Sequence, residues 1–343
     1  MVSTFPLIEV AGNAYQLGFQ HGAQAADLVR RYLQLIEHLT GLSRQMLSRN
    51  ALALLPAIES LSPRLVQEIH GLADGAGISF EEAVLCQVRT EAAHPAAEGC
   101  TLFAVRGSAT ADGQLLAGQN LDLEQEYAET AILLRVRPDD GRPAALLFTF
   151  AGQLGYSGMN EHGLAHFNAS LYDYHWRPGV SRQVLRRVLL EKRNVQEGIE
   201  LLAQQRTCSA ANLLLCDAQG GLANAEIRPE GIALYTDEQP DCLLHTNHYL
   251  TPEYAGYESG SLPDSFPRLT RLRALITERW GTISVETLKE VLADHDGYPA
   301  SICRHGTRNW HSIAGYIAQP AQGLLHVRRG YGCQGKWQRY SVT

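Results

Sequence analysis

The stretch EGCTLFAVR, residues 98–106, divides the chain into two parts of different character. Before it, apolar residues such as Val29, Leu33 and Ile36 recur at three- and four-residue spacing, which is typical of a buried helical face. After it, short apolar segments separated by Asp-Gly turns indicate β-strands. We therefore expect a helical N-terminal part and a strand-rich remainder that meet at Gly99 and Cys100.

The pattern of predicted elements favours an α+β domain in which helices cover sheets. Further helices are predicted at residues 65–72, 80–89, 181–192, 195–205, 264–280 and 284–293. Strands are predicted at residues 101–106, 115–119, 130–137, 144–150, 164–168, 212–216 and 242–246, followed by a C-terminal hairpin at 312–329. No internal repeat or low-complexity linker divides residues 1–343, so we expect a single domain.

Composition excludes several classes of protein. The chain has 343 residues, 45% of them hydrophobic, and a net charge of −7, which excludes a disordered chain and argues against nucleic acid or an anionic membrane as the main partner. The start of the chain does not have the pattern of a signal peptide, and no apolar run approaches the roughly 20 residues that span a bilayer. Seven cysteines without a CxxC pair argue against a disulfide scaffold or a cysteine zinc site, and we expect a cytoplasmic protein.

Cys100 is the first candidate for chemistry, because Gly99 leaves room beside it and permits unusual backbone angles. The alternative is a buried core cysteine that opens a strand. Further polar segments stand at the ends of predicted strands: GQNLD at 118–122, SAAN at 209–212 and HTNHY at 245–249. Each of these three segments can also be interpreted as a purely structural feature without a role in chemistry. The two histidines of HTNHY lack the HExxH pattern and a suitably spaced carboxylate, so they do not favour a metal site.

Together and in this order, these segments resemble the acyl-coenzyme A:6-aminopenicillanic acid acyltransferase (isopenicillin N acyltransferase) family. The resemblance extends over essentially the whole chain. It includes GFQHG at 18–22, Gly99-Cys100-Thr101, the three polar segments, Asp294-His295 and SICRH at 301–305.

The resemblance implies a four-layer αββα sandwich of the N-terminal-nucleophile (Ntn) hydrolase class, made as a precursor that cuts itself. The cut would fall between Gly99 and Cys100, giving a helical fragment 1–99 and a catalytic fragment 100–343, of 99 and 244 residues. The two fragments would stay together as a heterodimer. The expected substrate is a small-molecule amide, and no cofactor or metal is expected.

The resemblance places the catalytic roles on three residues. Cys100 would attack a carbonyl and form an acyl-enzyme, with its own new α-amine as general base. That amine has a reference pKa of about 7.7–8.0. Asp122 would position the amine, and Asn247 would donate a hydrogen bond to the tetrahedral oxyanion.

Five further residues follow from the same resemblance. Ser209 and Asn212 would assist self-cleavage or line the pocket. Arg304 would bind a substrate carboxylate through its planar guanidinium, or serve in a structural salt bridge. Asn120 and His248 would orient their neighbours.

Two alternative functions remain open at this point. One is a choloylglycine-hydrolase-like bile-salt or penicillin V acylase, although such relatives usually carry the cysteine next to the initiator Met. The other is a non-enzymatic binding protein that keeps the fold.

Overall fold

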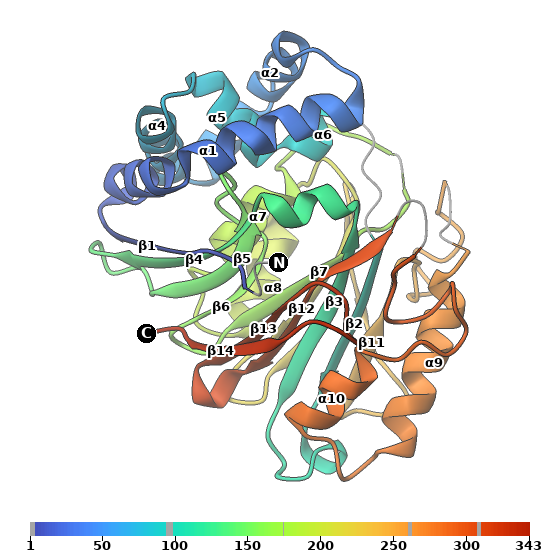
Figure 1. Cartoon of the computed structure of the whole chain (residues 1–343). Coiled ribbons are helices and arrows are strands. Elements are labelled where there is room, and N and C mark those ends of the chain that lie inside the picture. The colour runs from blue at the N-terminus through green and yellow to red at the C-terminus, as the bar shows by residue number, and fades with distance from the viewer. Residues whose placement is uncertain (1–3, 94–98, 174, 260–262, 307–309) are drawn as a thin grey trace.

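Two β-sheets lie face to face, and helices cover their outer faces (Figure 1). The computed structural model describes residues 4–93, 99–173, 175–259, 263–306 and 310–343. Among these residues, no helix has both the length and the apolar character needed to cross a membrane.

The larger sheet has eight strands in the order β1-β4-β5-β6-β7-β8-β9-β10. They are β1 (Leu7–Gly12), β4 (Ala131–Pro138), β5 (Ala145–Phe150), β6 (Ser157–Asn160), β7 (Ala165–Ala169), β8 (Ala211–Cys216), β9 (Leu222–Arg228) and β10 (Gly231–Tyr235). β1 runs parallel to β4, whereas the other neighbours are antiparallel. The N-terminal part of the chain is thus not entirely helical, because it also supplies an edge strand.

The smaller sheet carries the junction between the two parts of the chain. Its six strands have the order β11-β2-β3-β12-β13-β14. They are β11 (Cys242–His245), β2 (Gly99–Val105), β3 (Leu116–Leu123), β12 (His311–Gln319), β13 (Leu324–Arg329) and β14 (Trp337–Ser341). Every residue of β2 is buried, and its antiparallel register sets Gly99 opposite Asp122 and Cys100 opposite Leu121.

The inner faces of the two sheets form one core. The rings of Phe148 in β5 and Tyr316 in β12 lie 4.8 Å apart between their centroids. Side chains of β2 alternate between two environments, as a pleated strand requires. Cys100 and Leu102 belong to the core between the sheets, whereas Phe103 packs on the opposite side with helices α9 (Ser265–Glu278) and α10 (Val285–Val291).

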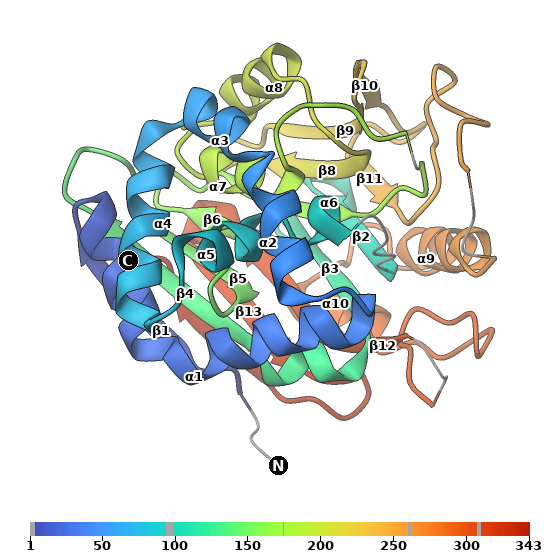
Figure 2. The same ribbon diagram turned by 90° about the horizontal axis from the view of Figure 1, so that it is seen from above.

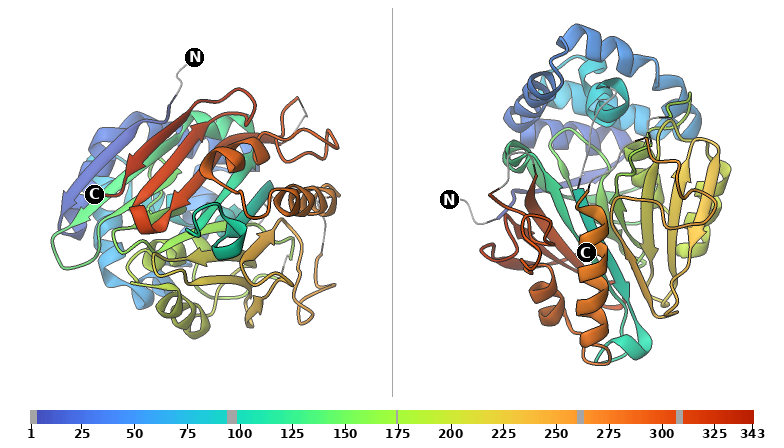
Figure 3. Two further views of the ribbon diagram at one scale, coloured as in Figure 1. Left: turned by 90° about the horizontal axis from the view of Figure 1, so that it is seen from below. Right: turned by 90° about the vertical axis from the view of Figure 1, so that its right-hand side faces the viewer.

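Helices form the two outer layers (Figures 2 and 3). They are α1 (Ala14–Thr40), α2 (Arg44–Leu52), α3 (Leu55–Leu61), α4 (Pro63–Ala76), α5 (Phe80–Gln87), α6 (Arg89–Ala93), α7 (Arg182–Leu189), α8 (Val195–Gln204), α9 (Ser265–Glu278) and α10 (Val285–Val291). α1 and α8 contact strands of the larger sheet, and α9 contacts β2 and β11 of the smaller one. The order helix, sheet, sheet, helix confirms the predicted αββα sandwich.

The segment GFQHG contains two glycines that let α1 and α4 approach closely. A Cβ atom built on Gly18 would lie 1.8 Å from the carbonyl oxygen of Glu68, and one on Gly22 would lie 2.4 Å from that of Leu72. Because both obstacles are backbone atoms, a side chain at either position would force the helices apart.

His21, between these glycines, joins α1 to the larger sheet. Its side chain is buried, and Nε2 accepts a hydrogen bond of 3.1 Å from the backbone N–H of Gly152. Burial lowers the pKa of His21 from 6.5 to about 4. The neutral ring is therefore the form compatible with the fold.

We predict that His21 makes the protein acid-sensitive. Since the folded state lowers this pKa, the stabilisation is complete above pH 6.5 and is lost as the pH falls through about 4. The loss amounts to roughly 3 kcal/mol for a shift of this size.

His21→Gln keeps an acceptor for Gly152 but cannot be protonated, so its unfolding free energy should fall less steeply with acid. Urea denaturation between these pH values measures this slope, with the exposed His162→Gln as control. Equal slopes for His21→Gln and wild type would contradict the prediction.

Candidate active site

Cys100 lies near the start of β2 with its side chain in the core between the sheets. It is fully buried, and its Sγ atom lies 3.8 Å from Nε2 of Gln119. The preceding residue must be small, because a Cβ atom on Gly99 would lie 2.8 Å from Nη1 of Arg304 and 3.1 Å from Cβ of Asp122. Close packing on the other face of the strand therefore explains the glycine beside the cysteine.

Asn247 lies next to the backbone of Cys100 because β11 pairs with β2. His245, the last residue of β11, is opposite Leu102 in this antiparallel pair. Two residues after His245 and two residues before Leu102, Asn247 therefore comes next to Cys100. Oδ1 of Asn247 accepts a hydrogen bond of 2.9 Å from the Cys100 N–H, and Nδ2 donates one of 3.0 Å to the carbonyl of Ser170. The side-chain amide thus has its oxygen directed at the Cys100 nitrogen.

Arg268, from α9, contacts both Cys100 and Asn247. It was not identified from the sequence as a site residue. Its guanidinium donates to the carbonyl oxygen of Cys100, to Oγ1 of Thr101 at 3.1 Å and to Oδ1 of Asn247 at 2.8 Å. It also pairs with Asp264 at 2.9 Å. The only signal in the sequence was the i,i+4 spacing of Asp264 and Arg268, which is equally typical of an exposed helix pair.

Asp122 lies on the face of the smaller sheet that α9 and α10 cover. Its Oδ1 accepts a hydrogen bond of 2.6 Å from Ser312, and Nη1 of Arg304 lies 3.8 Å from Oδ2. Burial raises the pKa of Asp122, while the charges of Arg304 and Arg268 oppose the rise. The carboxylate is therefore held opposite Gly99, beside the peptide bond that joins Gly99 to Cys100.

Arg304 is held by acidic residues of the protein itself. It is almost fully buried and donates to Oδ2 of Asp264 as well as lying beside Asp122. Of the two roles expected for Arg304, the structure thus contains the salt bridge, with Asp264 and Asp122 as its partners. Through Asp264, it connects to Arg268 and so to the backbone of Cys100.

Asn120 and His248 hold neighbouring segments in place. Asn120 donates to the carbonyl oxygens of Leu292 at 2.9 Å and Ile302 at 3.0 Å. Nδ1 of His248 lies 2.7 Å from Oγ of Ser265. Burial, followed by the charges of His245 and Arg268, lowers the pKa of His248 to about 4, so its ring is neutral near pH 7.

Ser209 and Asn212 have separate surroundings. Oγ of Ser209 donates to Oε1 of Glu91 at 3.2 Å, and the Asn212 amide donates to Oδ1 of Asn224 within the larger sheet. Ser209 lines a small hollow that reaches Ser170, the residue bound by Asn247. The other residues around this hollow are Thr90, Leu171, Tyr172, Asp173, Trp176, Arg182 and Ala210.

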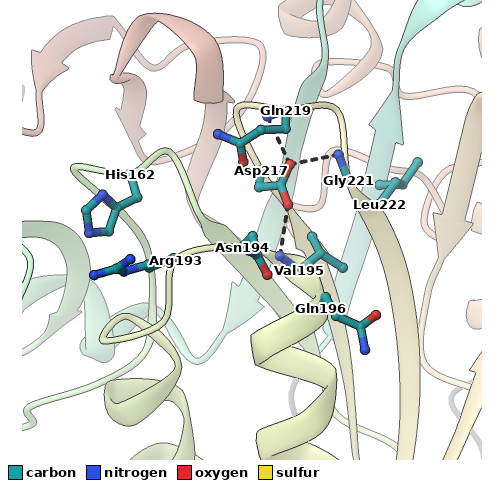
Figure 4. Close-up of a pocket in the computed structure, with 9 residues that line it drawn as sticks. All are labelled: His162, Arg193, Asn194, Val195, Gln196, Asp217, Gln219, Gly221 and Leu222. Atoms are coloured by element: carbon teal, nitrogen blue, oxygen red, sulfur yellow. Dashed lines mark hydrogen bonds between the residues drawn. The ribbon is translucent and has the colours of Figure 1, made fainter.

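A second hollow lies elsewhere, at the start of α8 (Figure 4). Its Asp217 carboxylate accepts hydrogen bonds from the backbone N–H groups of Val195 at 2.9 Å, Gln219 at 3.0 Å and Gly221 at 2.8 Å. These contacts hold two loops together. The hollow at Ser209 contains Ser170, which accepts a hydrogen bond from Asn247, whereas this one does not, and we assign it no role in catalysis.

Comparison with known proteins identifies the family. The family model described as acyl-coenzyme A:6-aminopenicillanic acid acyl-transferase matches residues 108–330. The chain belongs to this family. It is 28% identical over 305 residues to the 40 kDa form of acyl-coenzyme A:6-aminopenicillanic-acid-acyltransferase from Emericella nidulans, which covers 85% of this chain and 83% of that protein.

Two other relatives extend the comparison. An uncharacterized protein from Archaeoglobus fulgidus is 22% identical over 351 residues, covering 83% of this chain and 57% of that protein. A solved structure of a conjugated bile acid hydrolase from Clostridium perfringens superposes with a TM-score of 0.50 at 14% identity, covering 71% of this chain and 96% of that one. The family assignment and the shared fold confirm the predicted Ntn-hydrolase sandwich of the acyltransferase and acylase enzymes.

We predict that Arg268 is a major contributor to stability. Arg268→Ala removes one of the arginines that pair with Asp264, and the buried Asn247 oxygen loses a donor that it has in addition to the Cys100 N–H. Removal of one partner of such a buried pair costs about 3–5 kcal/mol. Arg271→Ala on the same helix is the matched control, because the Arg271 side chain is 33% exposed where it pairs with Asp294 and such pairs contribute at most about 1 kcal/mol. Chemical denaturation of both variants measures the difference, and equal losses would contradict the assignment.

Proposed function

We propose that this protein is a self-processing cysteine amidohydrolase or acyltransferase whose nucleophile is Cys100. The observation that carries the proposal is the hydrogen bond of 2.9 Å from the Cys100 N–H to Oδ1 of Asn247. Together with the contact of Arg268 to the Cys100 carbonyl, it holds the backbone on both sides of the Cys100 Cα atom. A core cysteine without chemistry has no need of such a polar setting in the interior of a sheet.

The proposed first reaction is cleavage of the bond between Gly99 and Cys100. Sγ of Cys100 attacks the carbonyl carbon of Gly99, the C–N bond breaks, and the departing nitrogen takes the proton that the thiol loses. Water then hydrolyses the resulting thioester, which restores the thiol and leaves a carboxylate on Gly99. The products are fragments of 99 and 244 residues, which stay together because strands of both fragments share one core.

The new α-amine of Cys100 then serves as general base for its own thiol. The amine is a base at neutral pH, unlike the amide nitrogen of the precursor. Asn247 keeps the nitrogen in place through Oδ1, and the Asp122 carboxylate stabilises its protonated form. Asn247 Nδ2, which donates to the carbonyl of Ser170, is also the proposed donor to the oxyanion.

The proposed substrate is a small N-acyl amine or amide. Tyr172 and Trp176 line the hollow beside Ser170 together with Arg182 and Asp173, and these side chains are the proposed contacts for the apolar and polar parts of the substrate. Attack on the amide carbonyl gives an acyl-enzyme and releases the amine. Water or a second amine then accepts the acyl group. The Emericella nidulans relative, named as an acyltransferase, supports transfer as well as hydrolysis.

Cys100→Ala is expected to abolish both processing and activity, because it removes the nucleophile for each. The variant should remain one chain of 37.7 kDa on denaturing electrophoresis and intact mass analysis, whereas the wild type gives two fragments. Cys242→Ala, on the adjacent strand β11, is the matched control and should be processed normally. Cleavage of Cys100→Ala, or an uncleaved wild type that turns over amides, would refute the proposal.

Asn247→Asp separates the two functions of this side chain. It keeps an acceptor for Cys100 and Arg268 but removes the Nδ2 donor. Processing should persist, and turnover should fall by about 10²–10³, as for the loss of one oxyanion donor. The assay uses the best substrate from a panel of N-acyl amino acids, penicillins and aminoalkyl amides, with the melting temperature as a check on folding. Unchanged kcat would rule out the oxyanion role.

A further inference from the structure

Four side chains outside the proposed catalytic centre converge on one point: His295, Cys303, His305 and Cys333. One nitrogen or sulfur atom of each lies within 4.8 Å of the corresponding atom of every other. Cys303 is buried, both histidines are half-buried and Cys333 is exposed. The cluster therefore combines an anchored inner side with an outer side that an ion can reach.

The donor atoms face one another closely. Nε2 of His295 lies 2.7 Å from Nε2 of His305, and Sγ of Cys333 lies 3.6 Å from the same His305 nitrogen. In a tetrahedral zinc site, the usual bond lengths place two nitrogens about 3.3 Å apart and a nitrogen and a sulfur about 3.6 Å apart. To reach that geometry the two nitrogens would separate by about 0.6 Å, and atoms near the 4.8 Å limit would approach by about 1 Å, which side-chain rotations can provide.

We propose that His295, Cys303, His305 and Cys333 bind one Zn²⁺ ion in a structural site. Two thiolates and two imidazoles are a donor set that selects zinc among the common divalent ions. The four protein ligands fill a tetrahedral shell, which leaves no open position for a water or substrate and so gives the ion no direct part in catalysis. Two thiolates also neutralise the charge of the ion.

The protonation of two proposed ligands bears on metal binding in opposite ways. Burial and the neighbouring His295 lower the pKa of His305, which favours the neutral ring that a metal requires. Burial raises the pKa of the Cys303 thiol to about 11, so this group is protonated at neutral pH when no metal is bound. Zinc binding would therefore release its proton, as is usual for cysteine ligands.

The ion would fasten the segment that carries Arg304. Arg304 stands between the ligands Cys303 and His305 and lies beside Asp122 and Asp264. Cys333 comes from the turn between β13 and β14, in a different part of the chain. Zinc would thus tie the turn to the Arg304 segment and limit the movement of Arg304 relative to Asp122.

The test is the zinc content of the purified full-length chain. After incubation with ZnSO₄ and dialysis against a weak chelator, elemental analysis should find about one zinc per chain. Replacement with Co²⁺ should give the intense visible d–d bands and the near-ultraviolet charge-transfer band of a tetrahedral thiolate complex. Neither measurement depends on cleavage at Cys100, so the result is independent of the proposed catalytic function.

Variants locate the ion. Cys333→Ser and His305→Ala should each lower the retained zinc at least about tenfold, and Cys333→Ser changes an exposed residue, so its fold is preserved. His162→Ala changes an exposed histidine in the turn between β6 and β7 of the larger sheet; it is the control and should retain zinc. Three results would overturn the proposal: no zinc above background in the wild type, unchanged zinc in Cys333→Ser, or a disulfide between Cys303 and Cys333 in mass spectrometry of the protein purified without reductant.

Discussion

The hydrogen bonds and the ion pair of the buried Arg268 guanidinium hold the segments around Cys100 in place. A charge in the interior is tolerated only when its donors are satisfied and its charge is paired. Arg268 meets this condition with Asp264, the oxygen of Asn247 and the carbonyl of Cys100. It therefore couples α9, the end of β11 and the start of β2, three segments that are remote in sequence.

The pleat of the smaller sheet divides the proposed chemistry between two faces. Cys100 projects into the core between the sheets, whereas its neighbours Gly99 and Thr101 face α9. Asp122, opposite Gly99, lies on that second face with Arg304. The acid in β3 and the sulfur in β2 are thus on opposite faces of the smaller sheet, and the proposed mechanism links them through the Cys100 nitrogen, which lies in the plane of the sheet. This division is consistent with a nucleophile whose own amine is the base.

Much of the fold could be predicted because its strands and helices have strong local patterns. The predicted elements at 101–106, 130–137, 144–150 and 181–192 overlap β2, β4, β5 and α7. The strands β1, β6, β9, β10 and β14 were missed. Of these, β1, β10 and β14 are edge strands with mixed polar and apolar faces whose burial depends on their neighbours. Ser209 and Asn212 were grouped by sequence, but the first lines the hollow beside Ser170 and the second pairs with Asn224.

Local periodicity and residue order are enough to identify the helical and strand-rich parts, the junction at Gly99 and Cys100, and the family to which the motifs belong. Which polar groups meet depends instead on how distant segments pack in three dimensions. Arg268 reaches Cys100, and Arg304 meets Asp264. Four His and Cys residues without metal-binding spacing converge beside them. Such contacts arise from strand pairing and helix packing across long stretches of chain, and no local pattern encodes them.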